Sequence, residues 1–336
     1  MKIIRRLQVP TGDIMVVQGS KGKLEIISVG DYGKDVNLKC DAMGLERNPE
    51  QVKHTKMLSL EEKWVITIST QYGCSMNCVF CDVPLVGSGI NATENDLIKQ
   101  VLAGLKIHPD VTFSKRLNVH FARMGEPTWN PNVLDAAKWL KTHIDPEYKV
   151  HPVVSTMMPK KNQWLKTFIH NWMRIKNRLY KGNAGLQLSI NSTNEIEREK
   201  MFAGNACNLF DIYKIMDGVV PIGRKITLNF AIADYEINPD VLLQYFDPDY
   251  YIIKLTPMHK TEGAIKNGIE TKGDYTTYYP YEKYEDDLKK AGYDVIVFIA
   301  SEYEDLGMIT CGNAILSGKN PNIPYTEIDM FDADNI

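Results

Sequence analysis

From about residue 64 onward, apolar runs rich in β-branched residues alternate with stretches of helical periodicity. The strand-like runs cover residues 64–70, 117–123, 150–156, 186–191, 226–233 and 251–257, and the helical patterns cover 95–107, 131–144, 162–180, 209–219 and 241–246. Strands that alternate with helices indicate right-handed βαβ units and a parallel sheet. Six such units are fewer than the eight that close a barrel. We therefore predict an α/β fold with an open, partial (β/α)6 barrel.

Two helix starts carry recognisable capping signals. Thr93 followed by Asp96 predicts a variant of the capping box. Asn130 before Pro131 predicts an N-cap with proline at the first helical position.

The two ends of the chain have different patterns. Residues 13–17, 23–28 and 35–39 are short strand candidates separated by glycine-bearing turns, which is typical of a β meander. The tail repeats the alternation once, with a helical pattern at 281–290 and a strand-like run at 294–300. We predict a small N-terminal β-rich extension (1–60), the barrel (61–260) and a C-terminal β/α extension (261–336).

Composition excludes few classes. The 336 residues are 44% hydrophobic and 24% charged, as in ordinary globular proteins. No apolar run reaches the roughly 18 residues of a membrane helix, and the N-terminus lacks the apolar core of a signal peptide. We therefore expect a cytoplasmic protein. The net charge of −3 gives no support to broad electrostatic binding of nucleic acid.

Three of the six cysteines lie within eight residues, just past the first predicted barrel strand. Cys74, Cys78 and Cys81 have the spacing C-x3-C-x2-C, which indicates a metal site rather than a disulfide framework. Three thiolates would bind three irons of a 4Fe–4S cluster and leave the fourth without a protein ligand. The alternatives are a zinc site with a distant fourth ligand or three cysteines buried by coincidence.

This spacing at the end of a first barrel strand resembles the radical S-adenosylmethionine (SAM) superfamily. The resemblance implies a partial barrel, a cluster whose open iron chelates SAM, and reductive cleavage of SAM to a 5′-deoxyadenosyl radical. A reductant protein such as flavodoxin or ferredoxin is then an expected partner.

Five further motifs are similar to the RlmN/Cfr family of RNA adenine methyltransferases, and they keep its order over about residues 50–315. They are Ser69-Thr70-Gln71-Tyr72-Gly73-Cys74, Met124-Gly125-Glu126-Pro127 with Asn130, Ser155-Thr156 with Pro159-Lys160, Leu188-Ser189-Ile190-Asn191 with Asn194, and Thr310-Cys311-Gly312. Each motif alone is weak, whereas five in order are fairly specific.

The resemblance implies a substrate in ribosomal or transfer RNA and a role for each matched residue. The residues implied to bind SAM are Gly125, Glu126, Ser155, Ser189, Asn191 and His259. Cys311 matches the cysteine that is methylated first and carries the methyl group to the base. His54 stands where the family has a glutamate that accepts a proton. Without the resemblance, 125–127 would be a simple turn, Ser155 and Ser189 solvated hydroxyls, and Cys311 a buried small hydrophobe.

Two departures from the family leave a second hypothesis open. Thr67 occupies the position of the family's second catalytic cysteine, and a hydroxyl does not form the disulfide that releases the product. The family's N-terminal RNA-binding domain is largely missing. The alternative is a radical SAM enzyme with altered chemistry on another nucleotide or a small substrate. A third hypothesis, from another class, is a non-catalytic binding module with a closed structural metal site.

One basic segment bears on nucleic-acid binding. Residues 160–181 contain seven Lys or Arg and no Asp or Glu, with Trp164, Phe168, Trp172 and Tyr180 interleaved. The spacing of the aromatics predicts a buried helix face. The basic side chains remain a candidate stripe for binding phosphates.

Overall fold

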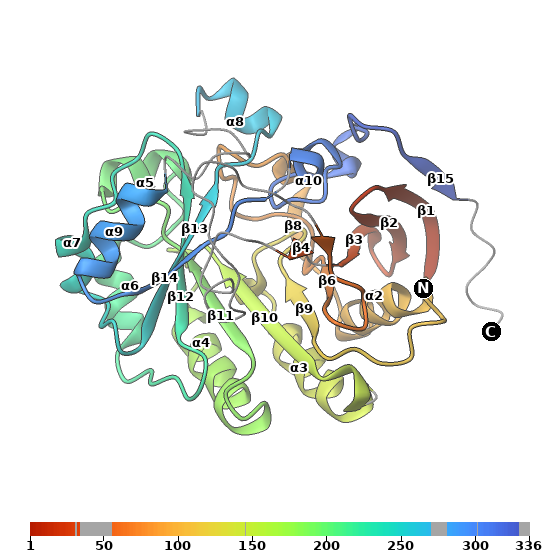
Figure 1. The fold of residues 1–336 in the computed structure, drawn as a ribbon, viewed down its shortest axis with the longest axis horizontal. Coiled ribbons are helices and arrows are strands. Elements are labelled where there is room, and N and C mark those ends of the chain that lie inside the picture. The colour runs from red at the N-terminus through yellow and green to blue at the C-terminus, as the bar shows by residue number, and fades with distance from the viewer. Residues whose placement is uncertain (31, 34–55, 145, 270–280, 301, 329–336) are drawn as a thin grey trace.

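One eleven-stranded sheet organises the chain. The computed structural model describes residues 1–30, 32–33, 56–144, 146–269, 281–300 and 302–328 (Figure 1). The sheet order is β14-β13-β12-β11-β10-β9-β6-β3-β2-β1-β15. The strands are β1 (Lys2–Val9), β2 (Gly12–Gly19), β3 (Gly22–Gly30), β6 (Trp64–Ile68), β9 (Leu117–Phe121), β10 (Val150–Thr156), β11 (Gly185–Ser189), β12 (Ile226–Ile232), β13 (Tyr251–Pro257), β14 (Asp294–Val297) and β15 (Thr326–Ile328). Two short antiparallel pairs of strands lie outside it in the described residues, namely β4 (Tyr32–Gly33) with β5 (Lys56–Met57) and β7 (Gln71–Gly73) with β8 (Ser88–Asn91).

The run from β6 to β14 is parallel throughout and forms the predicted partial barrel. β14 continues the parallel run beyond the six predicted strands. The helices are α2 (Glu94–Lys106), α3 (Asn132–His143), α4 (Leu165–Arg174), α5 (Glu195–Met201), α6 (Leu209–Met216), α7 (Pro239–Leu243), α8 (Glu262–Lys266), α9 (Glu282–Lys290) and α10 (Glu302–Leu306). No helix in the described ranges is long and apolar enough to cross a membrane.

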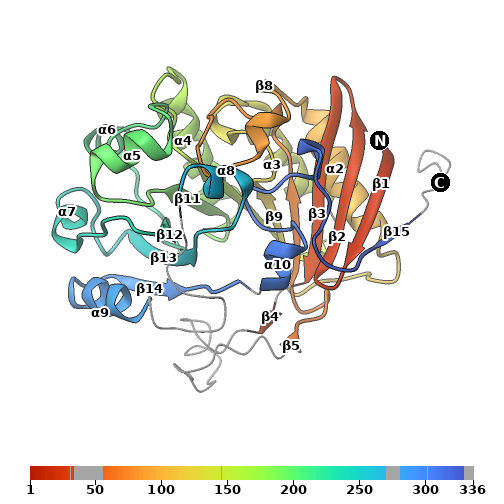
Figure 2. The same cartoon turned by 90° about the horizontal axis from the view of Figure 1, so that it is seen from above.

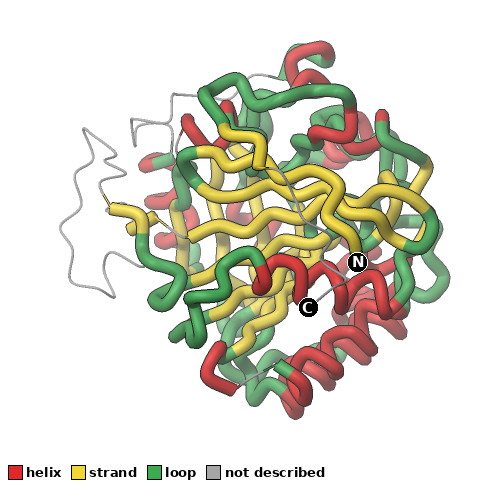
Figure 3. Tube along the Cα trace, turned by 90° about the vertical axis from the view of Figure 1, so that its right-hand side faces the viewer, coloured by secondary structure: helices red, strands yellow, loops and turns green. Residues whose placement is uncertain are grey.

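The N-terminal strands are an edge of the same sheet. β1, β2 and β3 form an antiparallel meander, and β3 pairs with β6 (Figure 2). β15 pairs with β1, so the two extensions meet at one edge of the sheet (Figure 3). The first strand was not predicted from the sequence, and the predicted strand at 35–39 lies outside the described residues.

The two faces of the parallel strands carry different side chains. Ile66 faces α2, because a Cβ on Gly104 of α2 would lie 3.0 Å from it. Phe121 likewise faces α4, where its ring meets Trp172 edge-on at 6.2 Å. Since successive side chains of a strand alternate between faces, Thr67 and its register partner His120 point to the opposite, inner face. This inner face is the concave side of the partial barrel.

Local sequence signals predicted some helix boundaries but not all of them. Thr93 and Asp96 form the predicted capping box at α2. The helix predicted at 162–180 is α4 followed by a π-helical turn over Ile175–Leu179. In this turn, the buried Lys176 ammonium donates hydrogen bonds to Gly182 O and Ile222 O. The short helix α10 has no counterpart among the elements predicted from the sequence.

Candidate functional site

The cysteine loop (residues 74–81) follows β6 and β7 at the carboxyl end of the barrel strands. The amides of Thr70 and Gln71 donate to Met124 O at 2.7 and 3.2 Å, which ties the end of β6 to the turn after β9. Gly73 has φ +77°, and a Cβ there would lie 2.1 Å from Gly87 O. Only glycine fits at the entry to the loop.

The three thiols of the cysteine loop lie in a common, partly buried environment. Cys78 is buried, whereas Cys74 and Cys81 are half-buried. Burial raises the pKa of Cys74 to about 11 and the pKa values of the other two further, and the neighbouring thiols add to the shift at Cys78 and Cys81. A bound metal would therefore have to displace protons from these thiols.

The spacing of the donors distinguishes between kinds of metal centre. Within the described part of the chain, no group of three or more His, Cys, Asp or Glu side chains lies within reach of one metal ion. A cubane cluster binds each thiolate to a separate iron, so its ligands need not converge on a single point. The donor set of Cys74, Cys78 and Cys81 fits the cluster.

The cysteine loop is fixed by contacts with distant segments. Val79 N donates to Met201 O at 3.0 Å, and Asn205 Nδ2 donates to Met76 O at 2.9 Å. From the C-terminal side, Thr261 Oγ1 donates to Phe80 O at 2.7 Å. These three contacts fix the position of the loop.

The predicted Gly125–Glu126 turn lies directly beside this loop. Gly125 has φ +95°, and a Cβ there would lie 2.6 Å from Gln71, so this position requires glycine. Its amide donates to the Cys74 sulfur, and Glu126 contributes to the raised pKa of Cys78. Gln71 Oε1 accepts from Glu126 N at 3.0 Å. The turn and the cysteine loop therefore form one unit.

Glu126 is only 2% exposed, and its carboxylate is strongly oriented. Oε1 accepts from Thr128 Oγ1 and Thr156 Oγ1, both at 2.7 Å, and Oε2 accepts from Met157 N at 2.8 Å. Burial raises the pKa of Glu126, and these donors oppose that shift. Oε2, with a single protein donor, keeps acceptor capacity for a ligand ammonium.

Three further residues predicted to bind SAM, Ser155, Ser189 and Asn191, lie near the ends of the next two strands but differ in their surroundings. Ser155 and Ser189 lie near the carboxyl ends of β10 and β11, and the pleat puts both on the inner face. Asn191 is 3% exposed and uses Oδ1 to accept from Ala231 N at 3.0 Å, so it joins β11 to β12. Ser155 is half-buried and Ser189 is buried, whereas Asn191 has a structural contact of its own.

The segment with Cys311 also reaches the cysteine loop. Gly312 O accepts from Asp82 N at 2.8 Å and lies 3.7 Å from Cys81 Sγ. Cys311 itself is exposed, so its reading as a buried hydrophobe is wrong. His259 lies at the same end of the barrel, with Nδ1 2.9 Å from Asp305 Oδ1. His54 lies outside the described residues.

Known proteins are similar to this chain in sequence and in fold. A protein of Sulfurimonas denitrificans named "Dual-specificity RNA methyltransferase RlmN" is 31% identical over 97 residues, which cover 29% of this chain and 27% of the relative. A Deinococcus deserti protein named "Probable dual-specificity RNA methyltransferase RlmN" is 28% identical over 280 residues, which cover 79% and 74%. The curated relatives are RlmN methyltransferases. The predicted resemblance to the RlmN/Cfr family is confirmed.

The alignments with these RlmN relatives are partial, since the first spans about a quarter of the relative's length. Among solved structures, a radical SAM methyltransferase from Sphaerobacter thermophilus matches with a TM-score of 0.65 at 16% identity, covering 93% of this chain and 80% of the other. This chain therefore shares the fold of that structure. No protein-family model matches the chain.

A buried ion pair that holds the Cys311 segment was not predicted from the sequence. Arg123, directly after β9, lies 2.8 Å from Glu25 of β3, and both side chains are almost completely buried. The guanidinium also donates to Met308 O and Thr310 O. An arginine next to a buried strand was the only signal, and its partner is 98 residues away.

Proposed function

We propose that the protein is a radical SAM enzyme that methylates adenine in RNA, as the names of its RlmN relatives suggest. One observation carries the proposal. The cysteine loop, the Gly125–Glu126 turn and the Cys311 segment, which come from three distant parts of the sequence, meet at the carboxyl end of one parallel barrel. That end is where α/β barrels hold their catalytic groups.

Each group would have a distinct task. Cys74, Cys78 and Cys81 would hold a 4Fe–4S cluster, which supplies the one-electron reduction that cleaves SAM. The Glu126 carboxylate would bind the ammonium group of SAM in a charge-assisted hydrogen bond. Ser155 and Ser189 would donate hydroxyl hydrogen bonds from the inner face of the barrel.

Cys311 would carry the methyl group in transit. Its segment is fixed to the cysteine loop through Gly312, while its own side chain is exposed. An exposed thiol beside the cluster is accessible both to SAM and to an RNA base. Thr67 faces the inner side of the barrel and does not supply a second thiol, so release of the product must use another group.

The experiment is anaerobic reconstitution with iron and sulfide, followed by reduction with SAM in the presence and absence of bulk RNA. We expect about four irons per chain, formation of 5′-deoxyadenosine, and methylated adenine when RNA is present. Cys78→Ala should lose iron and SAM cleavage, whereas Cys207→Ser, which removes a buried thiol outside the loop, should keep its iron. Absence of deoxyadenosine from an iron-loaded protein would refute the proposal.

A further inference from the structure

A second cavity, the α5–α6 pocket, lies outside the site described above. Its volume is about 400 Å³, and its walls include Lys160, Glu195, Arg198, Glu199, Phe210 and Tyr245. This volume is within the range of small-ligand sites. The walls combine aromatic faces, carboxylates and cations.

Exposed aromatic rings gather at one side of the α5–α6 pocket. Phe210 and Tyr213 of α6 are 48% and 45% exposed. Both approach Tyr245, with ring centroids 6.5 and 6.1 Å apart. Exposed apolar rings that cluster instead of scattering are typical of interaction surfaces. These rings offer stacking faces to a flat ligand.

Cations lie around the same rings. Lys214 Nζ is 4.0 Å from the centroid of Phe210, and Lys166 Nζ donates to Lys214 O at 3.5 Å. Lys160 is exposed at the pocket wall. Lysines beside stacking rings are the combination that binds single-stranded nucleic acid, since the rings take bases and the cations take phosphates.

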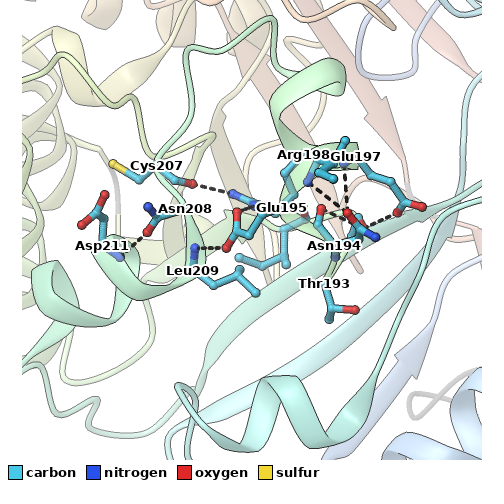
Figure 4. A network of polar contacts seen from close by, with 12 residues as sticks. Thr193, Asn194, Glu195, Glu197, Arg198, Cys207, Asn208, Leu209 and Asp211 are labelled. Atoms are coloured by element: carbon cyan, nitrogen blue, oxygen red, sulfur yellow. Dashed lines mark hydrogen bonds and ion pairs between the residues drawn. The ribbon is translucent and has the colours of Figure 1, made fainter.

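A network of polar contacts forms the inner wall of the α5–α6 pocket (Figure 4). Arg198 is 2% exposed, and its guanidinium donates to Ile190 O and Cys207 O. Glu195 Oε1 accepts from Leu209 N at 2.7 Å, while Oε2 stays 3.8 Å from Arg198 Nε, beyond hydrogen-bond length. Glu195 therefore keeps an acceptor for the amino edge of a base. The two carboxylates, Glu195 and Glu199, disfavour a bare phosphate inside the pocket.

The α5–α6 pocket is next to the cysteine loop but separate from it. Cys207 N donates to Met158 O and Lys160 N to Asn205 O, both at 2.8 Å. Asn205 in turn donates from its side chain to Met76 O of the cysteine loop. A ligand in this pocket would thus lie on the outer side of the segment that supports the loop.

We propose that the α5–α6 pocket is an auxiliary RNA subsite that binds an unpaired nucleotide, separate from the one that is modified. The base stacks on Tyr245 and meets the tilted ring of Phe210 at its edge. Its amino edge lies at Glu195, and the phosphates lie at Lys160 and Lys214. This proposal rests on the proposed function, because it requires an RNA substrate. It explains how a chain with a net charge of −3 binds RNA locally.

The test is fluorescence anisotropy with a labelled single-stranded 12-nucleotide RNA and the reconstituted full chain. The double variant Phe210→Ala/Tyr245→Ala should bind about tenfold or more weakly, from the loss of stacking. The control Tyr250→Ala removes another exposed tyrosine, 38% exposed, outside the pocket, and should bind as the wild type does. Lys214→Gln, a substitution at an exposed side chain, should reduce the magnitude of the slope of log affinity against log salt by about 0.7.

Each outcome decides the proposal. If the double variant and Lys214→Gln both match the wild type, the subsite is refuted while RNA binding stands. If Tyr250→Ala weakens binding as much as the double variant, the site is not specific and the proposal also fails. If the wild type binds no RNA, the subsite falls together with the RNA part of the proposed function, whereas SAM cleavage is measured separately.

Discussion

The buried Glu25–Arg123 pair joins the N-terminal strands to the segment that carries Cys311. Arg123 Nη2 lies 2.8 Å from Glu25 Oε2, and the guanidinium holds Met308 O and Thr310 O. Glu25 Oε1 accepts from Leu316 N at 2.6 Å. Arg123→Met would therefore remove two anchors of the C-terminal segment and leave a carboxylate buried without its cation.

The magnitude follows from that burial. Removing one partner of a buried ion pair costs about 3–5 kcal/mol, since the remaining charge stays desolvated. An unfolding entropy of roughly 2.1 cal/mol/K per residue gives about 0.7 kcal/mol/K for 336 residues. The melting temperature should thus fall by about 4–7 °C. The double variant Glu25→Leu/Arg123→Met, which buries no charge, should recover a large part of this loss.

The assay combines thermal unfolding with amide hydrogen exchange. Arg123→Met should speed exchange at residues 308–316, because their carbonyl anchors are lost. The matched control is Arg5→Met, which breaks an exposed Arg–Glu pair between β1 and β15 and should cost less than about 1 kcal/mol. Unchanged exchange at 308–316, with only a global loss of stability, would refute the anchoring role. Equal losses in the two arginine variants would refute the estimate from burial.

Three further predictions concern single groups. Gly125→Ala should weaken SAM binding and lower the urea midpoint of unfolding, because its Cβ would meet Gln71 at 2.6 Å. The control Gly218→Ala, also at positive φ but with nothing within 4 Å of its Cβ, should lower both quantities less. Burial and nearby cations lower the pKa of His120 to about 3, so the unfolded chain binds more protons between pH 3 and 6.5. Stability should therefore fall on acidification through this window, by at most about 1.4 kcal/mol per pH unit; His120→Gln should flatten the profile, and an unaltered profile would contradict the shift. Cys311→Ser should abolish RNA methylation while deoxyadenosine still forms, as chromatography of both products would reveal.

The repeating part of the fold could be predicted because its information is local. Six β-branched runs with helices between them indicated the parallel sheet, and Thr93 with Asp96 indicated the start of α2. The spacing of Cys74, Cys78 and Cys81 is likewise local, since all three belong to one loop. Periodicity and spacing are properties of residues that are close in the sequence, so they can be recognised without a structure.

Contacts between distant segments were decided only by the tertiary structure. β15 completes the sheet at β1, more than 300 residues away, through three residues with no strong strand pattern. The exposure of Cys311 and the buried Glu25–Arg123 pair depend on which surfaces the fold brings together. The α5–α6 pocket likewise draws its aromatic wall from α6 and from Tyr245, after α7. The sequence by itself determined the repeating units and the ligand types, whereas the way the units pack determined which groups meet, because burial and pairing depend on neighbours that no local pattern specifies.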